Sequence, residues 1–288
     1  MKKFLLGVCL FLSATLALAQ MPEKTWQEAK LAIQQGNFTQ AVQLLRPWAE
    51  RGDAQGQYGL GLMHYHGRGV AQDDTKAREW LEKAAAQGYA QAQFNLGVMY
   101  ASGRGVAQDY AKAREWWEKA AAQGDVGAQN NLGVMYRDGQ GVAQDDAKAQ
   151  DWFEKAAAQG HVEAQNNLGV MYGNGQGVAQ DYTKALEWWE KAAAQGHSGA
   201  QYNLGVMYAR GRGVVQDYAK AREWWEKAAA QGDVGAQYNL GVMYRDGLGG
   251  TQDDAKAREW FEQAAAQTEN AENADAVRQA RRALERIR

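Results

Sequence analysis

The chain has 288 residues, 45% hydrophobic and 23% charged, which is the balance of a folded globular protein and not of a disordered one. Its 32 basic and 34 acidic residues lie too near balance for a dedicated binder of nucleic acid or of anionic membranes, so we expect a protein or peptide partner and no nucleic acid. Only two prolines stand beside 33 glycines and abundant alanine, glutamate, lysine and glutamine, and this composition favours an all-α fold.

Residues 1–19 have the pattern of a cleaved secretory signal. Two lysines precede an apolar run from Phe4 to Leu16, and the Ala-Leu-Ala at 17–19 fits a small-x-small cleavage site. The run is shorter than the roughly 20 residues that span a bilayer, and no later segment approaches that length. We therefore expect an exported product, periplasmic or secreted, without stable membrane insertion. The only cysteine, Cys9, lies in this segment, so the mature chain is expected to have no disulfide and no thiol chemistry.

Residues 20–53 predict a pair of helices that caps the N-terminal end of a repeat array. The first helix is expected from Trp26 to Gln35 and the second from Phe38 to Arg51. This pair lacks the Gly-x-Gly turn that every later unit contains. Terminal units of helical arrays are atypical because one of their sides faces solvent.

Residues 54–267 contain six units of 36 residues without an insertion, and such a period indicates a repeat architecture. A Leu-Gly pair recurs at 60, 96, 132, 168, 204 and 240, and an invariant tryptophan recurs at 80, 116, 152, 188, 224 and 260. In the second unit, apolar residues from Ala92 fall at i, i+4, i+7 and i+8, as on one face of a helix. Asp109 is a good N-cap for a second helix, and Gly124 follows it where a left-handed residue would end it. Each unit therefore predicts a helix, a turn, a second helix and a stop.

Glycine in the middle of the first helix, Gly97 in the second unit, costs roughly 1 kcal/mol relative to alanine and needs compensation. We expect the second helix to approach closely there, with the invariant Trp116 buried in the remaining space. A ligand-stacking ladder of tryptophans is the alternative. The next position along, Trp117, varies in bulk between units, as at a packing site. Acid and lysine pairs such as Glu115 with Lys119 are expected to form i, i+4 ion pairs on the outer face of the second helix.

Residues 268–288 predict one final amphipathic helix that caps the C-terminal end. Thr268 replaces the closing glycine, and apolar positions from Ala276 to Ile287 form a single stripe with arginines opposite. A basic helix of this kind also fits a nucleic-acid or membrane contact, but the stripe favours the cap.

The units AQFNLGVMYASGRGVAQDYAKAREWWEKAAAQGD and AQYNLGVMYARGRGVVQDYAKAREWWEKAAAQGD resemble Sel-one-like repeats, a relative of the tetratricopeptide family. The resemblance covers residues 54–267, with the flanks as degenerate partners. It implies an all-α solenoid, a right-handed superhelix of stacked antiparallel helix pairs. It also implies a scaffold or adaptor that holds a protein or peptide on a concave side lined mainly by the first helix of each pair.

Carrying over the concave positions of the tetratricopeptide helix gives seven candidate partner-binding residues, which are Phe94, Asn130, Arg137, Asn166, Tyr202, Tyr238 and Arg245. They vary between units whose framework scarcely changes, although drift on a solvent face would give the same variation. The asparagine with which some tetratricopeptide domains clamp a peptide carboxylate is replaced by Val98 and its equivalents, so that mode of capture is not expected. Tyrosine and arginine are frequent binding hot spots, which favours an apolar-floored groove instead.

No catalytic, metal or cofactor constellation emerges from the sequence, so we expect a protein that is not an enzyme and needs no cofactor. His161 and His197 are equivalent residues one repeat apart, too far for a shared zinc ion, and are expected at helix ends. A hydrolase is the alternative, because a cysteine-rich branch of the Sel-one-like family is associated with β-lactam binding or cleavage. That branch relies on paired cysteines, which the mature chain lacks. The oligomeric state is left open.

Overall fold

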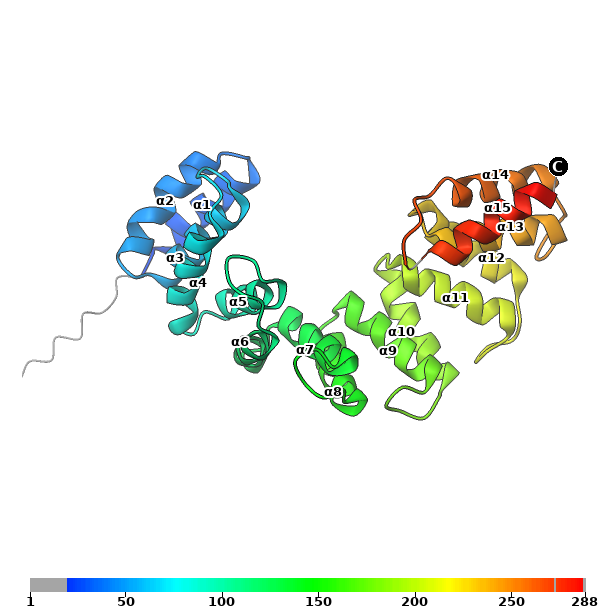
Figure 1. Cartoon of the computed structure of the whole chain (residues 1–288), viewed down its shortest axis with the longest axis horizontal. Coiled ribbons are helices and arrows are strands. Elements are labelled where there is room, and N and C mark those ends of the chain that lie inside the picture. The colour runs from blue at the N-terminus through cyan, green and yellow to red at the C-terminus, as the bar shows by residue number, and fades with distance from the viewer. Residues whose placement is uncertain (1–19, 272, 287–288) are drawn as a thin grey trace, which may run out of the picture. The chain divides into compact units, whose positions relative to one another are not determined.

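The computed structural model describes residues 20–271 and 273–286, and this part of the chain consists of fifteen helices and no strand (Figure 1). The predicted signal at 1–19 lies outside the described residues. The chain divides into two compact units, Met1–Ala120 and Ala121–Arg288. The sequence-based prediction of an all-α repeat solenoid is confirmed, because helix pairs recur along both units at the 36-residue spacing.

The first unit contains three helix pairs, the last of which ends just past the division of the chain. Its helices are α1 (Glu23–Gln34), α2 (Phe38–Glu50), α3 (Ala54–His66), α4 (Asp74–Ala86), α5 (Ala90–Ser102) and α6 (Tyr110–Ala122). The first helix begins three residues earlier than predicted, directly after Pro22, whose fixed φ suits a helix start. Asp53 anchors this end, because the main-chain N–H of Met21 donates to its Oδ2 at 2.8 Å.

The second unit contains four helix pairs and one final helix. These are α7 (Val126–Asp138) with α8 (Asp146–Ala158), α9 (Val162–Asn174) with α10 (Tyr182–Ala194), α11 (Ser198–Arg210) with α12 (Tyr218–Ala230), α13 (Val234–Asp246) with α14 (Asp254–Ala265), and α15 (Ala274–Arg286). Each helix packs on its pair partner and on the helix that follows. Helix α15 packs on α13 and α14, where Val277, Ala280 and Ala283 are buried, so it occupies the position predicted for a terminal cap.

The predicted helix signals are confirmed. The side chain of Asp109 accepts a hydrogen bond from the N–H of Lys112 at 3.0 Å, as an N-cap does. Gly124 ends α6 in the left-handed region with φ of +88°. The six helix-turn-helix units therefore follow from local sequence as well as from packing.

The prediction that the invariant tryptophan fills the space over the helix glycine is wrong. In the unit that begins at α11, Trp225 lies against Gly205 and is only 6% exposed, whereas the invariant Trp224 is half-buried. A Cβ on Gly205 would overlap the Trp225 indole, so the glycine is what allows the two helices of the pair to approach. The indole Nε1 donates to the main-chain oxygen of Tyr202 at 3.1 Å. The second, variable position therefore forms the core of each pair.

The invariant tryptophans serve the junction between consecutive pairs. Trp188 and Trp224 each pack, half-buried, against a core cluster that joins the second helix of the preceding pair to the first helix of their own pair. Lysine ammonium groups lie over their outer faces, with Lys227 Nζ 4.0 Å from the Trp224 ring centroid. The expected ion pairs of these lysines with acids four residues earlier are not found among the described residues, because the lysines turn toward the indoles instead.

Buried glutamines link consecutive pairs by hydrogen bonds. Gln201 donates through Nε2 to the main-chain oxygen of Ala193 at 3.4 Å and accepts at Oε1 from Gln231 at 2.8 Å. Gln237, its equivalent in the last pair, keeps the bond to a main-chain oxygen at 3.4 Å and is 4% exposed. Its Oε1 has no partner within the described part of the chain. The glutamine series therefore breaks off where the repeats end.

Candidate functional site

The structure places the seven candidate residues on the first helices of five pairs, all of them half-buried. They are Phe94 on α5, Asn130 and Arg137 on α7, Asn166 on α9, Tyr202 on α11, and Tyr238 and Arg245 on α13. Phe94 belongs to the first unit and the other six to the second. Tyr202 and Tyr238 line a common pocket, and the other five candidates are not among its lining residues.

The two candidate arginines of the second unit have local roles. Arg245 binds Asp246 beside it, with Nε 2.7 Å from Oδ1, and this contact raises the pKa of the guanidinium. Arg137 binds Asp138 in the same way and donates from Nη1 to Asn167 at 3.1 Å. Each guanidinium is paired with the aspartate that follows it in the same helix. These residues do not extend the pocket.

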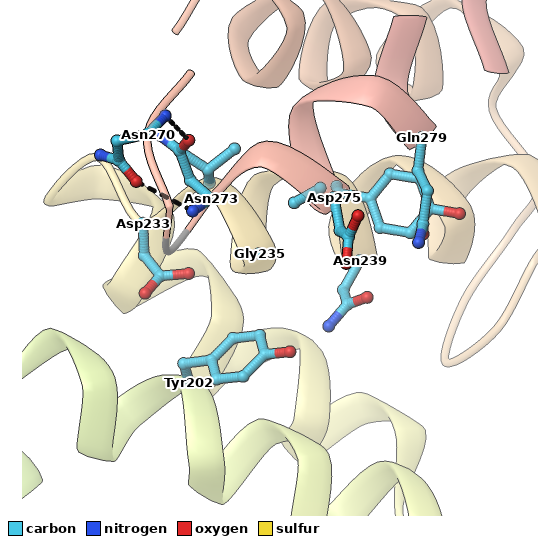
Figure 2. A pocket seen from close by; sticks show the side chains of 11 residues that line it. Tyr202, Asp233, Gly235, Asn239, Asn270, Asn273, Asp275 and Gln279 are labelled. Atoms are coloured by element: carbon cyan, nitrogen blue, oxygen red, sulfur yellow. Dashed lines mark hydrogen bonds between the residues drawn. The ribbon is translucent and has the colours of Figure 1, made fainter. Parts of the chain in front are cut away.

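A pocket of about 530 Å³ lies among α11, α13 and α15 (Figure 2). In the close-up, α11 supplies Tyr202 from one side, α15 supplies Asp275 and Gln279 from another, and the first turns of α13 lie between them. Its lining consists of Tyr202 from α11, Asp233, Val234, Gly235, Tyr238 and Asn239 at and after the start of α13, and Asn270, Asn273, Asp275, Ala276 and Gln279 at and after the approach to α15. A volume of this size is in the range of sites that hold small molecules or side chains.

The pocket exists because the terminal helix begins late. One repeat length after Val234, where α13 begins, the chain has reached Asn270, but α15 begins only at Ala274. Across these four residues Asn270 and Asn273 bind each other, since the main-chain N–H of each donates to the Oδ1 of the other, at 2.8 and 3.0 Å. The loop thus takes the place of the first turn of a helix. The missing turn leaves space next to α13.

Gly235 shapes the floor of the pocket. A Cβ at this position would lie 2.8 Å from Cε2 of Tyr202, closer than such contacts occur, so glycine lets the ring rest on the first turn of α13. The equivalent residue two repeats earlier is Glu163, and one repeat earlier it is Gly199. Glu163 binds His197, with Oε2 2.9 Å from Nε2. Asp233 stands one repeat after His197, and Gly199 stands one repeat after Glu163, so no side chain takes the place of the Glu163 carboxylate beside Asp233.

Asp233 is one of the two carboxylates that line the pocket. Its Oδ1 accepts from the N–H of Ala236 at 2.8 Å, which caps α13. Burial raises the pKa of its carboxyl above the usual range, against the hydrogen bonds from the main chain of Ala236 and Gly235. No lysine or arginine of the described residues lies within 4.0 Å of this carboxylate. The carboxylate is thus partly desolvated without a cation beside it.

The aromatic walls share this electrostatic environment. Burial raises the pKa of the Tyr202 hydroxyl, and the charge of Asp233 raises it further, while a hydrogen bond with Asn239 and the charge of Arg210 act in the opposite direction. The Tyr238 ring is held by Phe261, at 5.7 Å between centroids. Asp275 forms an ion pair with Arg278 one turn on, at 2.5 Å. The lining contains two carboxylates, and neither lysine nor arginine is part of it.

Sequence reasoning identified the two tyrosines and missed their neighbours. Asp233 has the pattern of a helix cap, and Asn239 belongs to a series that recurs at 95, 131, 167 and 203, so both resemble framework residues. Gln279 lies on the terminal helix, which the pattern predicts only as a cap. The sequence signal for these residues is the break in the 36-residue period at Thr268, which marks the end of the complete repeats.

The histidines have structural positions. His161 and His197 are helix ends as predicted, since the Nδ1 of each accepts from the N–H three residues on, at 3.3 and 3.0 Å. His64 is buried, and burial lowers its pKa. Within residues 20–271 and 273–286, no group of three histidines, cysteines or acids is arranged to hold a metal ion. None of the helices described there has the length and apolar character needed to cross a bilayer.

Comparison with known proteins identifies the repeats. The family model described as Sel1 repeat matches residues 31–53, 54–89, 90–125, 126–161, 162–197, 198–233 and 234–268. Six of these segments coincide closely with the six units predicted at 54–267. The seventh covers residues 31–53, so the predicted N-terminal cap includes a degenerate repeat. A comparison with curated protein sequences gave no match.

Two solved structures share the fold. One is c5321, a protective antigen present in uropathogenic Escherichia coli strains that displays an SLR fold, with a TM-score of 0.78 and 34% identity. The match covers 91% of this chain and 64% of the E. coli chain, so the present chain spans less than two thirds of its length. The other is a Sel1 repeat protein from Oxalobacter formigenes, with a TM-score of 0.76 and 29% identity over 86% of this chain and 99% of that one.

Proposed function

Because the chain belongs to the Sel1 repeat family, whose members are generally protein-interaction scaffolds, we propose that it binds a protein or peptide through the first helices of its pairs, at the pocket lined by Tyr202 and Tyr238. The fold is typically a non-catalytic scaffold. The observation that carries the proposal is the meeting of two variable tyrosines, predicted from sequence as binding residues, in a pocket of about 530 Å³. Tyrosine provides a large, rigid contact surface with a polar end, which suits recognition of a peptide.

The framework around the pocket supports this assignment. The core of each pair repeats almost unchanged along the array, whereas Tyr202 and Tyr238 stand at a variable position and the lining from Asn270 onward follows the last repeat. A stable repeated framework that presents variable side chains separates folding from recognition. The array is therefore proposed to supply rigidity, and its C-terminal end to supply selectivity.

Site-specific photo-crosslinking tests the binding surface. A photoreactive amino acid is introduced at Gln279, which lines the pocket, or at Glu223, which is exposed on α12 and serves as the control. We expect a crosslinked partner from Gln279 and none from Glu223, and we expect Tyr238→Ala to abolish the crosslink. Equal capture from both positions, or no effect of the tyrosine substitution on a variant that remains helical, would contradict the assignment of this surface.

Export through residues 1–19 is part of the proposal. The expected result is a mature protein that begins at Gln20 outside the cytoplasm, determined by N-terminal sequencing after cell fractionation. A protein that retains Met1 in the cytoplasm would show that the segment is not a cleaved signal. No contact among the described residues favours the β-lactam hydrolase alternative, and a chromogenic β-lactam is its direct test.

A further inference from the structure

The charges around the pocket select against anionic ligands. Two helices, α13 and α15, begin beside it, and helix N-termini usually favour anions through their free N–H groups. Here the carboxylate of Asp233 accepts from the N–H of Ala236, and Asn270 and Asn273 accept from each other's N–H. The Asp233 carboxylate would also repel an anion, whereas the charge of Asp275 is already paired with Arg278. An anionic group would therefore meet an acid without a cation partner at the start of α13.

No lysine or arginine is among the lining residues, and Asp233, unlike Asp275 with Arg278, has no cation partner among the described residues. Glu163 is the residue two repeats before Gly235, and its Oε2 lies 2.9 Å from Nε2 of His197. One repeat after that pair, Asp233 stands at the histidine register and Gly199 at the glutamate register, so neither a base nor an acid accompanies it. An incoming cation would pair with the carboxylate and compensate its burial.

From these observations we propose that the pocket binds a guanidinium or ammonium group, carried by an arginine or lysine side chain of the peptide partner. This inference rests on the proposed function and specifies its ligand. The cation would contact the Asp233 carboxylate and the ring faces of Tyr202 and Tyr238, since tyrosine rings attract cations within about 6 Å of their centroid. The amides of Asn239 and Gln279 are placed to bind the adjacent peptide main chain. The volume of about 530 Å³ leaves room for the side chain and part of that main chain.

Titration with blocked tripeptides tests the proposal on the full mature chain. The probes are acetyl-Gly-Arg-Gly-amide and the analogues with lysine, norleucine or glutamate in the centre, and binding is followed by NMR shifts of the Gly235 and Asn239 amides. We expect the arginine and lysine peptides to bind at least about tenfold more tightly than norleucine, with no saturable binding of glutamate, since a desolvated charge pair contributes at least this much. Equal affinity for arginine and norleucine would overturn the proposal.

Asp233→Asn with Asp125→Asn as its control isolates the charge. Asp125 caps α7 as Asp233 caps α13, with the N–H of Ala128 at 2.8 Å, and asparagine is itself a good cap. Both variants should therefore fold and melt alike. We expect Asp233→Asn to weaken arginine-peptide binding at least about tenfold and Asp125→Asn to leave it unchanged. Unchanged affinity in Asp233→Asn would remove the carboxylate from the site.

Two further outcomes separate the possible failures. Agmatine carries the guanidinium without a peptide, and agmatine binding as tight as the tripeptide would assign the pocket to a free small cation and overturn the peptide ligand. If the partner crosslinked from Gln279 binds equally well to Asp233→Asn, the cation assignment fails while the proposed function stands. If the chain crosslinks no partner and binds no peptide, the proposed function itself fails.

Discussion

The interior of the second unit and its C-terminal end are built from the same segment of sequence and differ in how that segment is continued. In the interior, α11 and α12 are followed by a complete pair, and Trp225, Gly205 and the Gln201 hydrogen bonds are all in place. At the end, α13 and α14 are followed by a helix that begins four residues late, and Gln237 has an Oε1 without a partner among the described residues. In the interior, a complete repeat leaves only a pocket of about 230 Å³ beside residues such as Val170 and Asn203. At the C-terminal end, where α15 begins late, the pocket has about 530 Å³.

The largest effect is expected from the interior core. Trp225→Ala should lower the free energy of unfolding by about 3–5 kcal/mol, because it empties a buried site that the rest of the pair cannot fill. Trp224→Ala, at the half-buried neighbouring position, should lower the free energy of unfolding by about 1 kcal/mol, because folding buries less apolar surface of Trp224. Urea unfolding followed by circular dichroism measures both. Equal losses would mean that the two tryptophans contribute alike, contrary to their burial.

Glycine substitution separates framework from site. Gly205→Ala gains about 1 kcal/mol of helix propensity but overlaps the Trp225 indole, so we expect a net loss of about 1–3 kcal/mol. Gly235→Ala meets only the edge of the Tyr202 ring, which can move, and should change stability by less than about 1 kcal/mol while it weakens arginine-peptide binding. Thermal melts and the peptide titration measure the two effects. The comparison fails if Gly235→Ala unfolds the unit as strongly as Gly205→Ala.

The glutamine series gives a smaller contrast. Gln201→Met removes a donor to Ala193 and the acceptor of Gln231, whereas Gln237→Met removes only a donor to Ala229. We expect Gln201→Met to be more destabilising by about 0.5–1.5 kcal/mol, the net contribution of one hydrogen bond. Urea midpoints of the two variants measure the difference. A larger loss in Gln237→Met would show that its Oε1 has a role that its contacts do not reveal.

The smallest effect concerns pH. Burial lowers the pKa of His161, against the opposing charges of Glu163 and Asp125, and its neutral Nδ1 accepts from the N–H of Ala164. A histidine with a depressed pKa stabilises the fold above its unfolded pKa of about 6.5, and this contribution is lost as pH falls. We therefore expect the melting temperature to fall more between pH 7 and pH 5 in the wild type than in His161→Asp. The difference should correspond to no more than about 1 kcal/mol of stability, the usual contribution of an N-cap. Parallel pH profiles would contradict this.

The sequence predicts the helix pairs because their signals are local. Asp109, Gly124 and the apolar spacing from Ala92 each act within a few residues, and the structure has them as expected. The choice between Trp116 and Trp117 was wrong, because both lie on adjacent faces of one helix and only the approach of Gly97 decides which is buried. Invariance favoured Trp116, but its constancy belongs to the junction with the preceding pair.

The site could be predicted only in part. Tyr202 and Tyr238 were found because they vary against a constant background, but Arg137, Arg245 and the asparagines vary as well and do not line the pocket. What separates them is the late start of α15, which depends on how the loop at Asn270 and Asn273 is held. The start of α15 is displaced by about one helical turn through tertiary packing, and no periodic pattern in the sequence indicates it.

The 36-residue spacing without insertions also bears on how such a chain can change length. Duplication or deletion of one whole unit, such as residues 162–197, joins equivalent positions and keeps the helix caps and the core positions in register. Because the lining residues lie on or beside α11, α13 and α15, such an exchange nearer the N-terminus would leave the pocket whole. Variants with different numbers of repeats can thus share the same proposed binding pocket at the C-terminal end.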